Sequence, residues 1–155
     1  MGWLGSLVGI GATVAAALVF CAGSVAAPPT KVLFERSYRA VSVTVRAGSD
    51  PFEDDQRIKV WFDRGLEPTG AYRYSVGWVV RCNRFGGDMK IGPHRLWVKP
   101  NFQTEQGCST AAERENEWML AFFDAGPGWE AGPRGTLILT SKSATLTLAR
   151  IVTTM

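Results

Sequence analysis

Beyond the apolar N-terminal segment, which contains Cys21, the residues of this 155-residue chain whose types could support covalent or metal chemistry are two cysteines and the single histidine. Cys82 lies in the stretch "RCNRFGGDMKI" (residues 81–91), and Cys108 follows further along. A nucleophilic Cys82 would need a neighbouring base, and His94, in a Gly-Pro turn, is the one histidine that could serve. Zinc requires about four ligands at recognisable spacing, which these three residues do not supply. A disulfide is therefore favoured over a Cys82–His94 pair.

The arrangement of carboxylates in the sequence does not indicate a metal site or a catalytic site either. Glu53, Asp54 and Asp55 lie together, but they lack the alternating oxygen ligands and the glycine of a calcium loop, so a solvated acidic turn is the better interpretation. The paired carboxylates of a glycoside hydrolase meet in space rather than in sequence, and nothing marks a pair here. The serine elbow G-x-S-x-G is absent from the sequence. We therefore predict no catalytic residue, no metal ligand and no cofactor.

The first 26 residues are typical of a secretory signal peptide. No charged residue occurs before residue 27, and an apolar run leads to Ser24 and Ala26, which are small enough for the two recognition positions of signal peptidase. We therefore expect a mature N-terminus at Ala27. Because the start of the chain lacks Lys and Arg, a retained membrane anchor is the alternative. Phe20 is too bulky for lipid attachment at Cys21.

Export, charge and cysteine count together define the class of protein. Removal of the signal peptide leaves Cys82 and Cys108, and an even number of cysteines in an exported protein indicates a disulfide between them. We expect Asn83, Gly86 and Gly87 to form a turn beside this bridge. The net charge is +3 with no run of Lys or Arg, so a nucleic-acid partner is not expected. A membrane is expected as a partner only if the N-terminal segment is retained as an anchor.

The hydropathy pattern predicts strands, one helix and then strands. Alternation predicts a half-buried strand over 38–47 that has Val41, Val43 and Val45 on one face. Further strands are expected within 57–62, 71–82 and 84–101, followed by a hairpin over 136–151. The helix is expected over 111–124, with Thr110 and Glu113 as a capping box. This order predicts an α+β fold: an antiparallel sheet or partly closed barrel of about seven to eight strands, with one main helix packed against it.

Tryptophans provide the candidates for a partner surface. Trp78 and Trp118 fall on apolar faces and are expected in the core. Trp61 lies on the opposite face from its apolar neighbours, and Trp129 lies in a loop rich in Gly and Pro. We therefore expect Trp61 and Trp129 to be exposed and to contact a partner. Gly77, inside the strand of Trp78, indicates a bulge or a close approach of backbone.

Several motifs in order resemble one known family. The segment 81–91 resembles the "GCN-aromatic-x-G-x-aromatic" motif of the META domain, also called the HslJ-like family, although Arg81 replaces its glycine. Residues 96–123 resemble the second motif, "T-x-M-x-C" followed by a helix, with Thr104 and Cys108 at the Thr and Cys and Gln106 near the usual Met. The closing hairpin is also similar. The resemblance covers 36–151 and implies three regions: a signal peptide (1–26), an extended lead-in (27–35) and a META-like domain (36–155).

The function expected from this resemblance is binding rather than catalysis. The META family comprises small exported or envelope proteins that are linked in bacteria to heat shock and antibiotic tolerance, and it has no established catalytic residues. We therefore expect a secreted or envelope-located module for envelope maintenance or stress tolerance that recognises a protein or an envelope component. The alternatives are a secreted protease inhibitor that presents the loop 126–135, and a carboxylate-based hydrolase.

Overall fold

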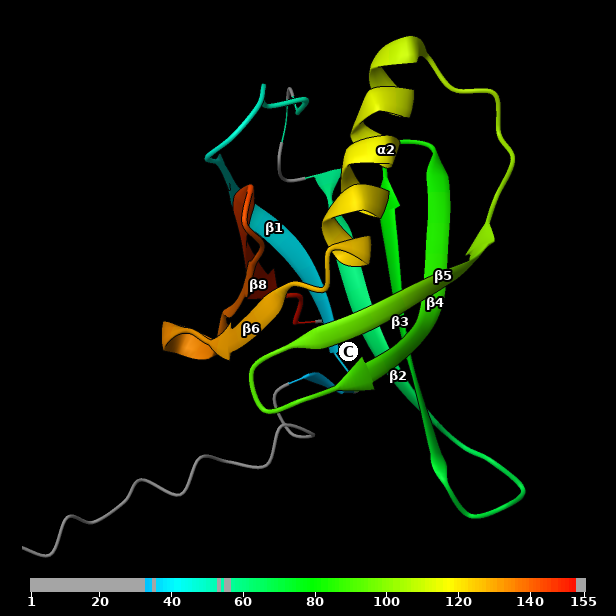
Figure 1. Ribbon diagram of the computed structural model, residues 1–155. Coiled ribbons are helices and arrows are strands. Elements are labelled where there is room, and N and C mark those ends of the chain that lie inside the picture. The colour runs from blue at the N-terminus through cyan, green and yellow to red at the C-terminus, as the bar shows by residue number, and fades with distance from the viewer. Residues whose placement is uncertain (1–32, 35, 53, 55–56, 153–155) are drawn as a thin grey trace, which may run out of the picture.

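The computed structural model describes residues 33–34, 36–52, 54 and 57–152 (Figure 1). These residues form one long helix and a series of antiparallel strands. The elements, in chain order, are β1 (Arg36–Val45), β2 (Lys59–Leu66), β3 (Tyr72–Val80), β4 (Asn83–Ile91), β5 (Leu96–Gln103), α2 (Thr110–Asp124), β6 (Gly128–Ala131), a short 3₁₀ turn (Pro133–Gly135), β7 (Leu137–Thr140) and β8 (Ala144–Arg150).

The strands form a single eight-stranded sheet in the order β5-β4-β3-β2-β1-β8-β7-β6. Every pairing is antiparallel. The sheet curls until its two edge strands meet at one bridge, between Arg95 and Gly128. The sheet is therefore a partly closed barrel, and the expected α+β class is confirmed.

Helix α2 packs on the inner side of the curled sheet, where it covers β5 and β3 (Figure 1). Trp78 of β3 is fully buried, with its ring centre 5.7 Å from Phe85 and 4.5 Å from Phe123 of the helix. Trp118 is half-buried and stacks on Phe122 at 5.3 Å. The core position predicted for Trp78 is confirmed, whereas Trp118 is only partly buried and packs against the core. The inner face is the hydrophobic core of the domain.

The first strand differs from its sequence prediction, and part of the expected lead-in packs into the core. Leu33 and Phe34, which belong to the expected lead-in, are buried in the core. In β1, Ala40 is fully buried, whereas Val41 is 52% exposed. The register shifts between Ala40 and Ser42, and such a bulge inserts one residue and so exchanges the two faces of a strand. The single valine face predicted for 41–45 is therefore wrong at Val41.

The helix begins one residue away from the predicted cap. Ser109, not Thr110, is the N-cap: its backbone is extended, and its hydroxyl accepts a hydrogen bond from the Ala112 nitrogen at 3.3 Å. Glu113 is then four residues from the cap, one residue too far for a capping box. Its backbone nitrogen donates to the Ser109 carbonyl instead.

Candidate functional site

The disulfide predicted between Cys82 and Cys108 is confirmed, with the two Cα atoms 6.3 Å apart. Cys82 lies in the turn between β3 and β4, and Cys108 lies just before the helix cap. The bridge therefore ties the sheet to the start of α2. This is the usual range of Cα separation for a disulfide.

Asn83 holds the segment that carries Cys108. Its side-chain oxygen accepts from Thr104 Oγ1 at 3.0 Å and from the Gln106 nitrogen at 3.1 Å. Its amide nitrogen lies 3.0 Å from Cys108 Sγ. Asn83 is only 5% exposed, so these contacts satisfy a buried amide. The expected turn at Asn83, Gly86 and Gly87 is wrong, because all three lie in strand β4, whose pairing with β5 shifts register between Gly86 and Gly87.

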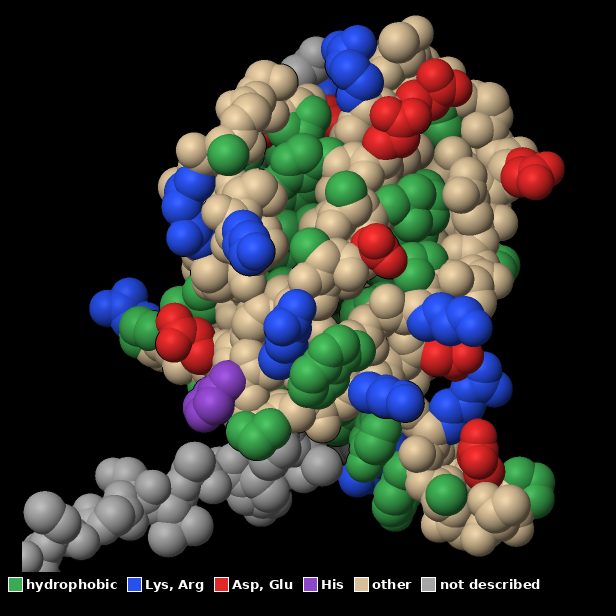
Figure 2. Space-filling view, viewed as in Figure 1, with side chains coloured by type: hydrophobic (Ala, Val, Ile, Leu, Met, Phe, Trp, Pro, Cys, Tyr) green, Lys and Arg blue, Asp and Glu red, His purple; other side chains and the backbone are tan. Residues whose placement is uncertain are grey.

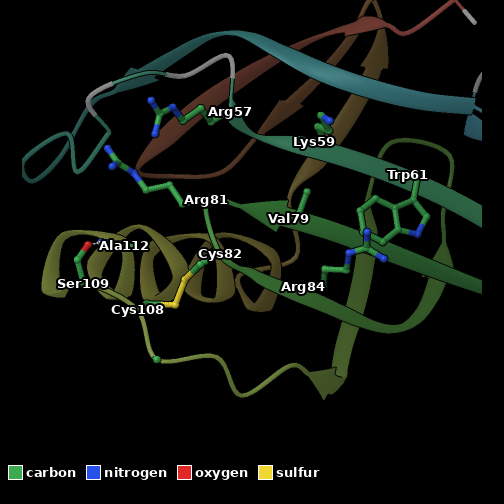
Figure 3. Close-up of a pocket in the computed structure, with 11 residues that line it drawn as sticks. Arg57, Lys59, Trp61, Val79, Arg81, Cys82, Arg84, Cys108, Ser109 and Ala112 are labelled. Carbon is green, nitrogen blue, oxygen red and sulfur yellow. Dashed lines mark hydrogen bonds between the residues drawn. A yellow bond between two sulfur atoms is a disulfide. The ribbon is translucent and has the colours of Figure 1, made fainter.

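A basic pocket of about 960 Å³ opens beside this disulfide (Figure 3). Four cationic side chains line it, together with Trp61 and the two cysteines; the cations are Arg57, Lys59, Arg81 and Arg84. Two of the cations have carboxylate partners: Arg57 pairs with Asp54 at 3.3 Å, and Arg81 pairs with Glu115 at 2.7 Å.

Lys59 and Arg84 have no ion pair with any described residue, and the sheet register holds them in one line. Lys59 on β2 is opposite Val79 on β3, which is opposite Arg84 on β4. All three side chains therefore point to the outer face, and the Cα atoms of Lys59 and Arg84 lie roughly 10 Å apart across two strand spacings. A pocket of this kind attracts an anionic group.

Trp61 lies flat on the outer face at the Arg84 end of this pocket (Figure 3). It is opposite Gly77, and a Cβ atom on Gly77 would overlap the indole ring of Trp61. Gly77 pairs regularly with both neighbouring strands, so what approaches it is the Trp61 side chain and not the bulge or close backbone approach predicted from the sequence. Trp61 is half-buried, as expected for a ring that rests on a glycine with its other face turned outward.

A second hollow of about 650 Å³, the polar groove, continues from the basic pocket and shares Trp61 and Arg84 with it. Gly77 and Gly86 are opposite each other in the sheet, and Phe102 is opposite Gly86 on the next strand. The polar groove therefore has two glycines at its floor and an aromatic ring at each side. Phe102 is 54% exposed.

Asp88 is the centre of the polar side chains in this groove. Its carboxylate accepts from the Arg73 guanidinium at 2.6 Å and from Asn101 Nδ2 at 2.9 Å. The hydrogen bond to Asp88 raises the pKa of Arg73, so the Arg73 guanidinium stays positively charged. Asp63 and Ser75 also line the groove. The groove thus offers both donors and acceptors, in contrast to the cationic pocket beside it.

Comparison with known families identifies the domain. The sequence pattern of the META domain matches residues 31–153. The chain belongs to the META domain family. Its fold is similar to the NMR structure of a protein from Burkholderia xenovorans, with 18% identity, a TM-score of 0.58 and coverage of 80% of this chain and 87% of that one. A second NMR structure shares 15% identity, with a TM-score of 0.53 and coverage of 79% and 94%. No curated protein matches at a significant level.

Cys82 and His94 are too far apart to act together in this META domain. They lie beyond opposite ends of β4, which has nine residues and therefore runs for about 30 Å. His94 is exposed in the turn before β5, and Cys82 is already in the disulfide. The alternative of a Cys82 nucleophile with a His94 base is therefore wrong for the oxidised protein.

Trp129 is not exposed, which corrects its assignment to a partner surface. It is only 9% exposed and belongs to the core. Strand β6 forms within the Gly- and Pro-rich segment and pairs with β7, which turns Trp129 inward opposite Leu139. The indole Nε1 donates to the Gly92 carbonyl at 3.0 Å. Of the two predicted contact residues, Trp61 lines the basic pocket described above.

Two further features concern metals and membranes. Among the described residues, no cluster of three His, Cys, Asp or Glu side chains could hold a metal ion, and Glu53 and Asp55 lie outside those residues. No described helix is long and apolar enough to cross a membrane.

The expected signal peptide, residues 1–26, also lies outside the described part. On the face shown in Figure 2, Lys and Arg side chains are interspersed with Asp and Glu.

Proposed function

We propose that this META domain is an exported, non-catalytic binding module that captures an anionic envelope component at the basic pocket. The observation that carries the proposal is the alignment of Lys59 and Arg84, two cations without a described carboxylate partner, on one wall of a pocket. Two cations that flank Val79 on the same face of the sheet, without a carboxylate partner among the described residues, repel each other, and an anion between them relieves that repulsion. The pocket is therefore more favourable when it is occupied by an anion.

The chemistry of the pocket supports binding over turnover. Guanidinium groups stay charged throughout the physiological pH range, so they position and neutralise an anion but do not relay protons. The pocket also contains the oxidised Cys82–Cys108 pair, which offers no thiol nucleophile. Charge capture is the activity to which these side chains are suited.

Export is supported by the disulfide, because such bonds persist in oxidising compartments. We propose removal of residues 1–26 and a mature N-terminus at Ala27. The mass of the protein recovered from the exported fraction tests this. A full-length species in the membrane fraction would show that the segment is a retained anchor.

The inhibitor alternative finds less support in the structure. Most of the loop 126–135 is strand β6 and a tight turn, which the hydrogen bonds Gly132 N to Thr136 O and Thr136 N to Pro133 O close. An inhibitory loop would need an extended, exposed backbone that a protease can bind as a strand. We therefore do not propose inhibition.

Retention of envelope components on immobilised protein tests the binding proposal. The wild type is compared with the double variant Lys59→Glu and Arg84→Glu, and with Lys142→Glu as a matched reversal on the exposed β7–β8 turn. We expect a component that is retained by the wild type and by the Lys142 variant, is lost from the double variant, and is released as salt rises. Equal retention by all three proteins would contradict the proposal.

A further inference from the structure

We infer that the basic pocket and the polar groove together bind an acidic oligosaccharide, with a sugar ring stacked on Trp61 and its anionic group held by Lys59 and Arg84. The inference rests on the proposed function and names the ligand class of the same site. It is built on three neighbouring features: a flat aromatic surface, a cationic end and a mixed polar end.

The aromatic surface is prepared before any ligand binds. Gly77 has no side chain, so the indole of Trp61 lies against the sheet where a Cβ atom would otherwise be. One face of the ring is thereby covered, and the other is directed to the solvent. The negative face of an aromatic ring attracts the C–H groups on the apolar face of a pyranose. Because the ring is fixed in place, little side-chain freedom is lost on binding.

The cationic end defines the charge of the sugar. Lys59 is two residues from Trp61 on β2, and Arg84 is two residues from Gly86 on β4. The two cations thus lie on the same side of the indole, on either side of Val79. A carboxylate or phosphate group on a ring stacked at Trp61 would reach both. The guanidinium of Arg84 can form the paired hydrogen bonds that such groups accept.

The polar groove determines which sugar unit can follow the charged sugar that stacks on Trp61. Asp63, Asp88 and Asn101 line the groove beyond Trp61, and Arg73 fixes the carboxylate of Asp88. Carboxylate and amide groups of this kind exchange hydrogen bonds with neighbouring hydroxyls. Phe102 lies on the far side of Gly86, where a second ring can contact it. The two ends therefore suit a chain of sugars that is charged at one unit and rich in hydroxyls at the next.

The same features disfavour two other anionic polymers. A single-stranded nucleic acid carries a phosphate at every unit, and the carboxylates of Asp63 and Asp88 would repel those phosphates along the groove. An extended peptide gains affinity by adding to a sheet edge. The groove lies instead on the face of β2, β3 and β4, whose backbone groups already pair with one another.

Titration calorimetry with the exported protein tests the inference. The main probe is a short oligogalacturonate, and its matched control is the same oligomer with the carboxylates reduced to alcohols. A sugar phosphate separates carboxylate from phosphate as the anionic group. Inorganic phosphate tests charge alone, and oligo-dT tests a nucleic acid. We expect the oligogalacturonate or the sugar phosphate to bind most tightly and the reduced oligomer to bind at least about tenfold more weakly.

Variants separate stacking from charge. Trp61→Ala should raise the Kd by about tenfold, and Trp61→Phe should recover part of the loss. The matched control is Trp97→Ala, which removes a 49% exposed tryptophan from the far end of the same face and should leave the Kd unchanged. Thermal melting checks that each variant is folded. Recovery by Phe distinguishes a lost stacking surface from a damaged fold.

The outcomes distinguish this inference from the proposed function. If inorganic phosphate binds as well as the acidic sugars and Trp61→Ala has no effect, the sugar assignment fails but anion capture stands. If oligo-dT binds more tightly than the acidic sugars, the sugar assignment is likewise wrong and the site binds a nucleic acid. If no acidic sugar binds while an envelope component is still retained through Lys59 and Arg84, the sugar assignment alone is wrong. If that retention is also absent, both proposals fail.

Discussion

Arg81 Nε donates a 2.7 Å hydrogen bond to Glu115 Oε2, and this pair joins the β3–β4 turn to the helix α2. Glu115 is 2% exposed, so its charge is buried, and its partner Arg81 is partly buried. Arg81 has a φ of 51°, in the left-handed region that favours glycine. The META motif has glycine at this position. This chain places an arginine there, and the ion pair with Glu115 compensates for the strained backbone.

Breaking this ion pair should destabilise the protein strongly. Glu115→Ala leaves the partly buried Arg81 without its carboxylate, and we expect a loss of about 3–5 kcal/mol in the free energy of unfolding. Arg81→Gly relieves the backbone strain but leaves Glu115 buried alone, so it should also destabilise. The double variant Arg81→Gly, Glu115→Leu should recover most of the loss. Urea unfolding measures all three, and a double variant as unstable as the sum of the two would contradict this account.

The Cys82–Cys108 bridge should contribute about 3–4 kcal/mol, because it closes a loop with a sequence separation of 26 residues in the unfolded chain. Replacement of both cysteines by serine should lower the midpoint of urea unfolding accordingly. Reductant should lower the midpoint of the wild type but not that of the variant. A thiol assay on the denatured, unreduced protein should find neither Cys82 nor Cys108 free. Two reactive thiols from these positions would rule out the bridge.

Much of the fold follows from local patterns that are visible in the sequence. The period of two in 71–82 gives β3, and the last hairpin forms where its alternation predicts. The disulfide follows from the number of cysteines left in the chain after the expected signal peptide. Each of these features depends on residues within one element or on simple pairing. For that reason a single sequence was sufficient to predict them.

Apart from the helix cap, which is one residue from its predicted place, the main corrected features depend on contacts between distant segments. The inward turn of Trp129 requires β6 to pair with β7, and the bulge after Ala40 is defined by its partner β8. The basic pocket forms because the register places Lys59 and Arg84 in one row. Register across three strands is a tertiary property, so no spacing in the sequence could indicate this site. The unexplained Gly77 beside Trp78 was the nearest signal.

Stability should fall on the alkaline side because of Tyr38. Burial raises the pKa of Tyr38, which is fully buried in β1. An unfolded tyrosine ionises near pH ~10, so above that pH the unfolded chain releases its proton before the native protein does. The free energy of unfolding should therefore decline from about pH 10 upward. Tyr38→Phe should flatten this decline, whereas Tyr72→Phe, at a 54% exposed position, should not. Equal slopes of the free energy of unfolding against pH in the two variants would contradict this role of Tyr38.

Two adjacent glycines of β4 should respond differently to alanine. A Cβ atom on Gly87 would lie 2.5 Å from the Lys99 carbonyl oxygen and 2.9 Å from its carbon, so the backbone of β5 would have to move. We expect a cost of about 1–3 kcal/mol, as for other overpacked sites. At Gly86 the nearest backbone atom is 3.4 Å away, and alanine should be tolerated. Thermal unfolding compares the two variants, and equal melting temperatures would be evidence against the close β4–β5 approach.

Alanine at Gly77 should remove the aromatic surface without removing Trp61. The new Cβ atom would overlap the indole, and the ring must swing away from the sheet. We expect the indole N–H resonance of Trp61, assigned with Trp61→Phe, to shift and to become more accessible to solvent. The affinity for oligogalacturonate should fall as far as it does in Trp61→Ala. Gly65→Ala is the matched control, since nothing lies within 4 Å of its Cβ position on the neighbouring β2. If Gly77→Ala keeps both the resonance and the affinity of the wild type, the ring does not rest on Gly77 and the stacking surface is wrongly placed.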